Sequence, residues 1–354
     1  MVSLLTQVIW KCLYGTSSRD HGTLGYFKSL LNRTEVKKDP KKAVDATIDF
    51  LLTVVRGHIL AVAFEILGVT KLDSHIPLPP GLCSSTRHQQ YAFVKSIAVQ
   101  VVEKCTLVDG AVTRENVINV NDGVYNYARV LCHYGALVME FRDAWAEGDG
   151  ERVYNCWRLF LPHFLTSNCR KYALEALRLQ FQVRAVLSPH LAQHILWDRF
   201  VNTAGGAGRN VPCDLHNEHV NKLLKHVIVN MGSNLTEEAL RRAAKSVSML
   251  HAICVQFDRR SGVPFGTHAH STKSDNEDVA KVASKVLQNE LLTVKPGRKH
   301  SSYKGMRTNP LWNWKVDNTK EWIENKKKQF VKYRGTVREA DATDDESSES
   351  NTED

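Results

Sequence analysis

The sequence predicts an all-α protein, with one large and irregular multi-helix domain and an acidic tail. Apolar residues recur at helical spacing along most of the chain, and no segment sustains the period of two that marks a half-buried strand. The chain has 354 residues, of which 43% are hydrophobic, so it can bury a full core.

Each predicted helix is a run of this spacing that ends at a break in the pattern. Proline and glycine supply the clearest breaks, at 77–81, 148–150 and 205–208. The helix from Thr236 shows the pattern plainly, because Asn234 and Glu237 have capping-box spacing and an apolar stripe follows them. In chain order, the predicted helices span residues 2–14, 22–32, 41–67, 88–106, 123–147, 151–165, 170–186, 189–200, 214–230, 236–258, 275–292 and 319–333.

Composition divides the chain into four parts. The apolar stripes end near Phe257, and the residues that follow are rich in Ser, Gly, Thr and His. We therefore predict a helical domain at 1–258, a linker with a short helix at 259–294, a basic and aromatic segment at 295–338, and a disordered acidic tail at 339–354. Core-type residues stand at the initiator from Val2 onward, so we also expect the chain to be part of a longer architecture.

Several features predict an intracellular protein without a membrane partner. The most apolar stretch, residues 48–69, contains charged residues, which favours a buried amphipathic helix over a membrane span. Residues 1–10 lack the basic start and the cleavage site of a signal peptide. The eight cysteines are scattered without the paired spacing of a zinc site, so we interpret them as reduced core residues.

The densest group of carboxylates and imidazoles is the run Asp214-Leu215-His216-Asn217-Glu218-His219. With Asp214 as N-cap, an ordinary amphipathic helix explains both acids, because they precede lysines and complement the helix dipole. Two other interpretations stay open. Asp214 and Glu218 could be the catalytic carboxylates of a magnesium-dependent nuclease, or His216 and His219 could bind a metal ion. The sequence supplies no further ligands for either, so no cofactor is predicted, except Mg²⁺ if the nuclease interpretation holds.

The glycine-rich loop at 203–209 precedes this run. We expect no strand before the loop, and no Gly-Lys-Ser/Thr follows it. We therefore interpret it as a flexible connector and not as a phosphate-binding loop.

Charge is distributed unevenly and favours a polyanionic partner. The formal charge is +9, but residues 339–354 hold eight acids and no base, which leaves 47 basic against 30 acidic residues, or +17, in the rest. Basic and aromatic residues mix at 295–338, a combination that suits phosphate contact and base stacking, although the last helix could simply dock on the body. Lys326-Lys327-Lys328 is also typical of a nuclear import signal. The candidate nucleic-acid-binding residues are Lys295, Arg298, Lys299, Lys304, Arg307, Lys326, Lys327, Lys328, Lys332 and Arg334.

Five short motifs together resemble an uncharacterised eukaryotic family, the domain of unknown function 6589. The motifs are His21-Gly22-Thr23-Leu24-Gly25, Lys38-Asp39-Pro40-Lys41-Lys42, Tyr172-Ala173-Leu174-Glu175-Ala176-Leu177, Trp197-Asp198-Arg199-Phe200-Val201-Asn202 and the run from Asp214 to His219. The resemblance extends to about residue 260 and implies a transposon-associated origin. If longer members carry an RNase H-like core, the chain would resemble the helical part of a truncated transposase, with Glu218 in the place of the last catalytic acid.

Such chemistry needs at least two more carboxylates presented by strands, so we expect no catalysis by this chain alone. We predict a nuclear, transposon-derived protein that binds nucleic acid non-specifically through its basic surface. The alternatives are a protein-interaction scaffold and a metal-dependent nuclease or transposase remnant that uses Asp214 and Glu218.

Overall fold

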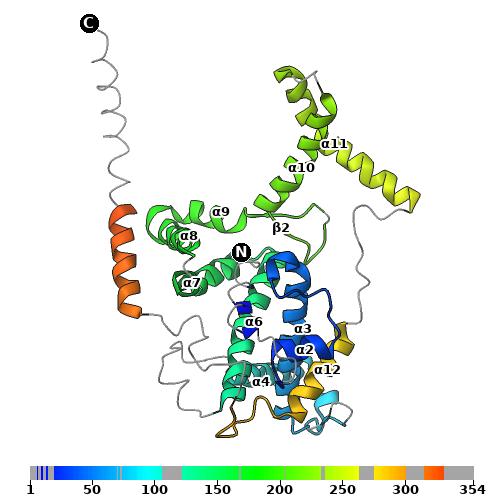
Figure 1. The fold of residues 1–354 in the computed structure, drawn as a ribbon, viewed down its shortest axis with the longest axis vertical. Helices are drawn as coiled ribbons and strands as arrows, with labels where there is room; N and C mark the ends of the chain where they lie inside the picture. Colours follow the sequence, from blue (N-terminus) through cyan, green and yellow to red (C-terminus); the bar gives the residue numbers. More distant parts are fainter. Residues whose placement is uncertain are drawn as a thin grey trace.

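Helices supply nearly all of the regular structure (Figure 1). The computed structural model describes residues 6, 9–10, 13–14, 20–69, 71, 74–105, 122–166, 169–203, 205–232, 236–262, 275–299 and 315–330. Within these residues, the strands are β1 (Phe200–Val201) and β2 (Val211–Pro212), which form a short antiparallel pair. The predicted all-α class is confirmed. The acidic tail at 339–354 lies outside the described residues.

The apolar helix α3 (Val44–Ile66) runs through the middle of the core. Among the described helices, it is the one that is long and apolar enough to cross a membrane, and 67% of its most apolar window is buried inside the protein. This burial agrees with the buried helix predicted at 48–69. The helices packed on α3 are α2 (Leu24–Leu30), α4 (Arg87–Cys105), α6 (Gly123–Glu147) and α12 (Asp275–Gln288), and the short helical turns nearby are η1 (Pro40–Lys42) and η2 (Leu82–Ser84).

Two glycines allow the closest helix contacts of this core. A Cβ atom at Gly57 of α3 would lie 2.4 Å from Val282 Cγ1 of α12, and one at Gly135 of α6 would lie 2.1 Å from Val55 Cγ2 of α3. Real Cβ atoms do not approach other atoms so closely, so a side chain at either position would push the helices apart. The close approach at Gly57 places α12 directly on α3, although α12 follows the predicted domain boundary at 258. That boundary stays a prediction, but Val282, Ala283 and Val286 of α12 belong to the same core.

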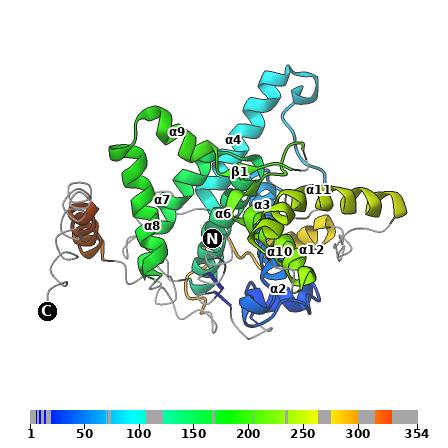
Figure 2. The same ribbon diagram turned by 90° about the horizontal axis from the view of Figure 1, so that it is seen from above.

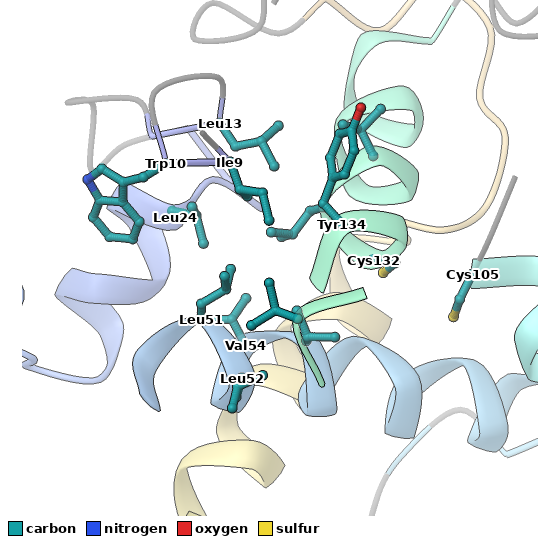
Figure 3. Packing of buried hydrophobic residues seen from close by; sticks show 14 of the residues in the cluster. Ile9, Trp10, Leu13, Leu24, Leu51, Leu52, Val54, Cys105, Cys132 and Tyr134 are labelled. Atoms are coloured by element: carbon teal, nitrogen blue, oxygen red, sulfur yellow. The ribbon is translucent and has the colours of Figure 1, made fainter. Parts of the chain in front are cut away.

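The described part of the N-terminal segment is also built into the core. Ile9, Trp10 and Leu13 are buried, and Figure 3 shows them close to Leu24 and to Leu51 of α3. The Trp10 indole N–H donates to the Lys38 carbonyl at 3.0 Å. The buried Tyr127 hydroxyl of α6 donates to the Leu13 carbonyl at 2.6 Å and accepts from the Leu24 amide at 3.1 Å. These bonds satisfy polar groups that would otherwise be costly to bury.

Asp122 joins the start of α6 to the segment that follows α12. Its carboxylate caps α6 by accepting from the amides of Val124 at 3.0 Å and Tyr125 at 3.1 Å. The same carboxylate accepts from the Lys295 amide at 2.8 Å and from Arg298 Nε at 2.9 Å. Burial alone would raise the pKa of Asp122. The hydrogen bonds from Arg298 and from the amides of Lys295 and Tyr125, together with the charge of Arg298, instead lower this pKa below its ordinary value.

A second group of helices lies on the side of α6 opposite α2 and α12 (Figures 1 and 2). It is made of α7 (Gly150–Thr166), α8 (Arg170–Phe181), the π-helical turn η3 (Gln182–Val186) and α9 (Pro189–Trp197). The prediction of one helix at 170–186 is therefore corrected, because the last five residues form a π turn. A glycine in the left-handed conformation ends α6 at Gly148, and a Ser188 cap followed by proline starts α9.

The chain then forms an arm that extends away from the core (Figure 1). The arm consists of α10 (Cys213–Met231) and α11 (Glu237–Ser261), which pack on each other. Two expectations need correction here. The helix begins at Cys213 with Pro212 in the cap position, so Asp214 is not the N-cap. The strand β1 also precedes the glycine-rich loop, which connects β1 to β2. Just after the loop, the Asn210 amide and side chain both donate to the Ala146 carbonyl.

Candidate nucleic-acid interface

A helix over residues 316–330 carries the predicted lysine run Lys326–Lys328. Its aromatic face packs on the body: Trp322 and Ile323 are partly buried against the core, and Phe330 stacks on Phe181 of α8 with ring centroids 5.6 Å apart. Lys327 and Lys328 are exposed. The helix therefore docks through its aromatic residues, as one interpretation of the sequence expected, and still presents its lysines to solvent.

This docking creates a basic groove against the start of α8. The groove has a volume of about 570 Å³, and Arg170 also lines a hollow beside it with Lys171 and Tyr172. Apolar and aromatic side chains form part of the wall, and cationic side chains stand at both sides. The residues of the groove are Leu165, Thr166, Arg170, Lys315, Asn318, Thr319 and Trp322, and together with Lys171 and Tyr172 we call this surface the α8 groove.

The start of α8 strengthens the positive potential of the groove. The first amides of a helix lack partners within the helix and carry the positive end of its dipole. The cap position holds Cys169, which makes no side-chain cap hydrogen bond, and the first turn contains no acidic residue. Instead it contains Arg170 and Lys171, both exposed. An anion at this place would complement both the helix end and the two cations.

The structure describes six of the ten predicted nucleic-acid-binding residues, and none of these six lines the α8 groove. Among the lysines of the 316–330 helix, Lys326 donates to Gln329 at 2.8 Å and Lys327 lies 3.6 Å from Glu324. Lys299 is exposed, and the Lys295 side chain is paired with Glu290. The candidates Lys304, Arg307, Lys332 and Arg334 lie outside the described residues.

Arg298 has an internal role in the structure. Its Nε donates to Asp122, its Nη1 to the carbonyls of Asn289 and Glu290, and its Nη2 to Asp122 and the Thr293 carbonyl. These bonds use all five N–H donors of the guanidinium group, so none remains for a phosphate. The sequence could not distinguish this arginine from one on the surface.

The candidate catalytic carboxylates lie on the arm. Asp214 and Glu218 are exposed in the first turns of α10. The charge of Asp214 favours the charged form of Arg199. Burial still lowers the pKa of Arg199 below its ordinary value. His216 is half-buried, and the side chain of His219 is outside the described part of the chain. Among the described side chains, no three or more His, Cys, Asp or Glu residues are placed to hold a metal ion.

Sequence reasoning missed two sets of residues. Arg170 and Lys171 belong to the groove, and the signal for them was a pair of cations at the predicted start of the helix at 170. A polar chain on α9, formed by His190, His194 and Asp198, was missed as well. Its signal was the spacing of four residues, which places side chains on one face of a helix.

Comparison with known proteins identifies the family. The model of a family of unknown function, DUF6589, matches residues 2–270. The chain belongs to the DUF6589 family. Its match covers the core helices α2 to α9 and the α10–α11 arm, whereas α12 and the 316–330 helix follow the matched residues. No curated protein and no solved structure was found to match this DUF6589 chain.

Proposed function

We propose that this DUF6589 protein binds nucleic acid non-specifically through the α8 groove. The observation that carries the proposal is the combination, in one groove, of Arg170, Lys171 and Lys315 with the rings of Tyr172 and Trp322. Cations bind the phosphate backbone without reading its sequence, and aromatic faces stack on any base. The proposal includes a eukaryotic, transposon-derived origin, a nuclear location and no catalysis by this chain alone. The resemblance to the family supports the transposon-derived origin and the absence of catalysis, and the run Lys326–Lys328 and the positive charge support the nuclear location.

Salt dependence of binding tests the proposal. The double substitution Arg170→Ala/Lys171→Ala removes two phosphate contacts, so the slope of log K against log salt should fall by about 1.8 for duplex DNA or about 1.4 for a single strand. The measurement is fluorescence anisotropy of labelled 20-nucleotide DNA of unrelated sequences, from about 50 to 200 mM salt. Removing residues 295–338 would be a poorer test, because it also removes Arg298 from the buried Asp122 carboxylate.

A matched control comes from the arm. Arg241→Ala/Arg242→Ala removes the same charge from the exposed face of α11, where Glu237 and Glu238 pair with these arginines. The control should leave the slope unchanged. Equal losses in both variants would show that only net charge matters, and an unchanged slope in the groove variant would refute binding at the groove.

One observation favours the alternative of a protein-interaction scaffold. The second half of α11 exposes Met249, Leu250, Ile253 and Phe257 to between 45% and 70%. Leu240, Val247, Leu250 and Phe257 follow heptad spacing, and Val247 is buried. We call the stripe of apolar residues from Leu240 to Phe257 the α11 seam. Its first half, at Val247, is buried, and its second half is open to solvent.

The occupant that fits this open seam is a second copy of the chain. The four side chains expose roughly 400 Å² of apolar surface, taking about 180 Å² for each when fully exposed. Since apolar atoms form about 60% of an interface, each copy would bury roughly 700 Å², close to a standard interface. Sedimentation analysis should then show a dimer that Ile253→Glu abolishes and Val99→Glu, an exposed position on α4, does not. A monomer at all concentrations would exclude this pairing.

A further inference from the structure

The helix α9 carries a row of exposed polar side chains that the α8 groove does not use. His190, His194 and Asp198 follow one another at intervals of four residues, so they lie along one face of α9 and its C-cap. His194 Nδ1 lies 2.7 Å from Asp198 Oδ2, and His194 Nε2 lies 3.3 Å from His190 Nε2. The side chains of His194 and Asp198 are 52% and 69% exposed.

The Asp198 carboxylate sets the tautomer of this row. A carboxylate only accepts, so neutral His194 carries its proton on Nδ1 and turns the lone pair of Nε2 outward. In the absence of another partner, His190 donates its Nε2 proton to that lone pair. If His190 instead carries its proton on Nδ1, both Nε2 atoms carry lone pairs, and they lie 3.3 Å apart.

The separation of the two nitrogens matches metal coordination. Zinc binds histidine nitrogen at about 2.0–2.1 Å in tetrahedral geometry, which places two ligand nitrogens roughly 3.3–3.4 Å apart. Two histidines four apart on a helix also form the binding pair of the HExxH zinc motif. In that motif a glutamate follows the first histidine, whereas Leu191 stands at this position here. The comparison therefore concerns the ligand pair alone and not the protease reaction.

We propose that His190 and His194 bind a borderline divalent transition-metal ion, with zinc as the representative, through their two Nε2 atoms. Imidazole suits zinc, copper and nickel, whereas magnesium and calcium prefer oxygen ligands. Asp198 is the outer partner that orients His194 through Nδ1, the arrangement that zinc-bound histidines commonly show. The protein supplies two ligands, so water completes the coordination shell and the site stays open to solvent.

The backbone around the pair is held in place. Ser188 caps α9, Pro189 occupies its first turn, and Ala192 on the opposite side is buried. Gly150 at the start of α7 lets the Leu196 carbonyl approach closely, since a Cβ atom at Gly150 would lie 2.2 Å from that oxygen. A rigid helix keeps the two imidazoles near their binding positions before the ion arrives, which reduces the entropy lost on binding.

Calorimetric titration of the purified full chain, without a histidine tag, with zinc chloride tests the proposal. The parent protein should bind zinc at a site that His190→Ala and His194→Ala each weaken at least 10-fold. His88→Ala, at another exposed histidine, should leave this affinity unchanged. Asp198→Asn should weaken zinc binding about 10- to 100-fold, because outer partners contribute on this scale.

Two results would count against zinc binding by this histidine pair. Unchanged zinc affinity in both histidine variants would overturn the proposal, as would magnesium binding of the same strength at the same site. All four variants alter exposed positions, so their circular dichroism should match that of the parent protein. DNA binding at the α8 groove is a separate readout, because none of its cations is changed.

Discussion

The substitution Arg298→Met tests whether Arg298 is an internal anchor or a nucleic-acid ligand. The change keeps a long apolar side chain but removes the charge beside Asp122, whose carboxylate is fully buried. Removing one partner of a buried ion pair costs about 3–5 kcal/mol, because it leaves an unpaired buried charge. Three backbone amides still donate to Asp122, so we expect the lower end, about 3 kcal/mol.

Urea unfolding followed by circular dichroism measures this loss. With a slope of about 3 kcal/mol per M, the midpoint should fall by roughly 1 M. Arg241→Met is the matched control, because its ion pair with Glu237 is exposed and should contribute less than about 1 kcal/mol. The double variant Asp122→Ser/Arg298→Met removes both charges and keeps a capping hydroxyl, so its loss should be smaller than the sum of the two single losses.

Two results would refute this reasoning. The first is an Arg298→Met loss no larger than that of the control. The second is a fall in the salt slope of DNA binding for Arg298→Met, which would mean that the guanidinium contacts phosphate after all. The pH dependence supplies a further check. Because the folded-state pKa of Asp122 is lowered, the stabilisation by its charge is present above the ordinary carboxyl pKa of about 3.9 and is lost as the pH falls through the folded value.

Two further predictions concern the core. Burial lowers the pKa of His58 to about 4 and that of His163 to about 3, so the unfolded chain takes up protons below about 6.5 that the folded chain does not. The stabilisation that comes from keeping these histidines neutral should therefore be complete above pH 6.5 and should fall below it, by about 2 kcal/mol for each histidine at pH 5. Urea titrations at pH 7.5 and pH 5 measure this difference in unfolding free energy. The variant His163→Phe should make the difference about 2 kcal/mol smaller. In a second test, Gly57→Ala should destabilise the protein by about 1–3 kcal/mol in urea unfolding, because the added methyl group would meet Val282. Helix propensity alone predicts a gain in stability for this change. A measured gain would therefore contradict the close packing of α3 on α12.

The positions of the helices could be predicted from the sequence because their signals are local. Asp122, Gly148 and Ser188 lie at helix ends, where their side chains or backbone angles act on groups within a few residues. The π turn after Phe181 and the start of α10 at Cys213 were missed, because they depend on the neighbours of those segments. The glycine-rich loop was interpreted without its strands, since a pair of two-residue strands is too short to show alternation.

The groove was predicted only in part, for a different reason. Arg298 and Arg170 have the same chemistry in the sequence. In the structure Arg298 donates to a carboxylate 176 residues away, whereas Arg170 lines a groove together with residues of the 316–330 helix. Composition locates the cations and does not tell which of them already have partners. The stacking of Phe330 on Phe181 decides which surface the basic helix completes, and that contact joins residues far apart in the chain.

The contrast between α11 and α12 shows the same limit for apolar faces. Both helices have an apolar stripe of helical spacing, which indicates that some surface must cover each stripe. Val282 and Val286 of α12 are buried where α12 packs on α3, and Gly57 leaves room for Val282. On α11, which packs on α10, Val247 is buried, whereas Ile253 and Phe257 are exposed. Within the described part of the chain, the stripe of α12 is covered and the second half of the stripe of α11 is not, so the dimer test with Ile253→Glu asks whether a second copy covers it.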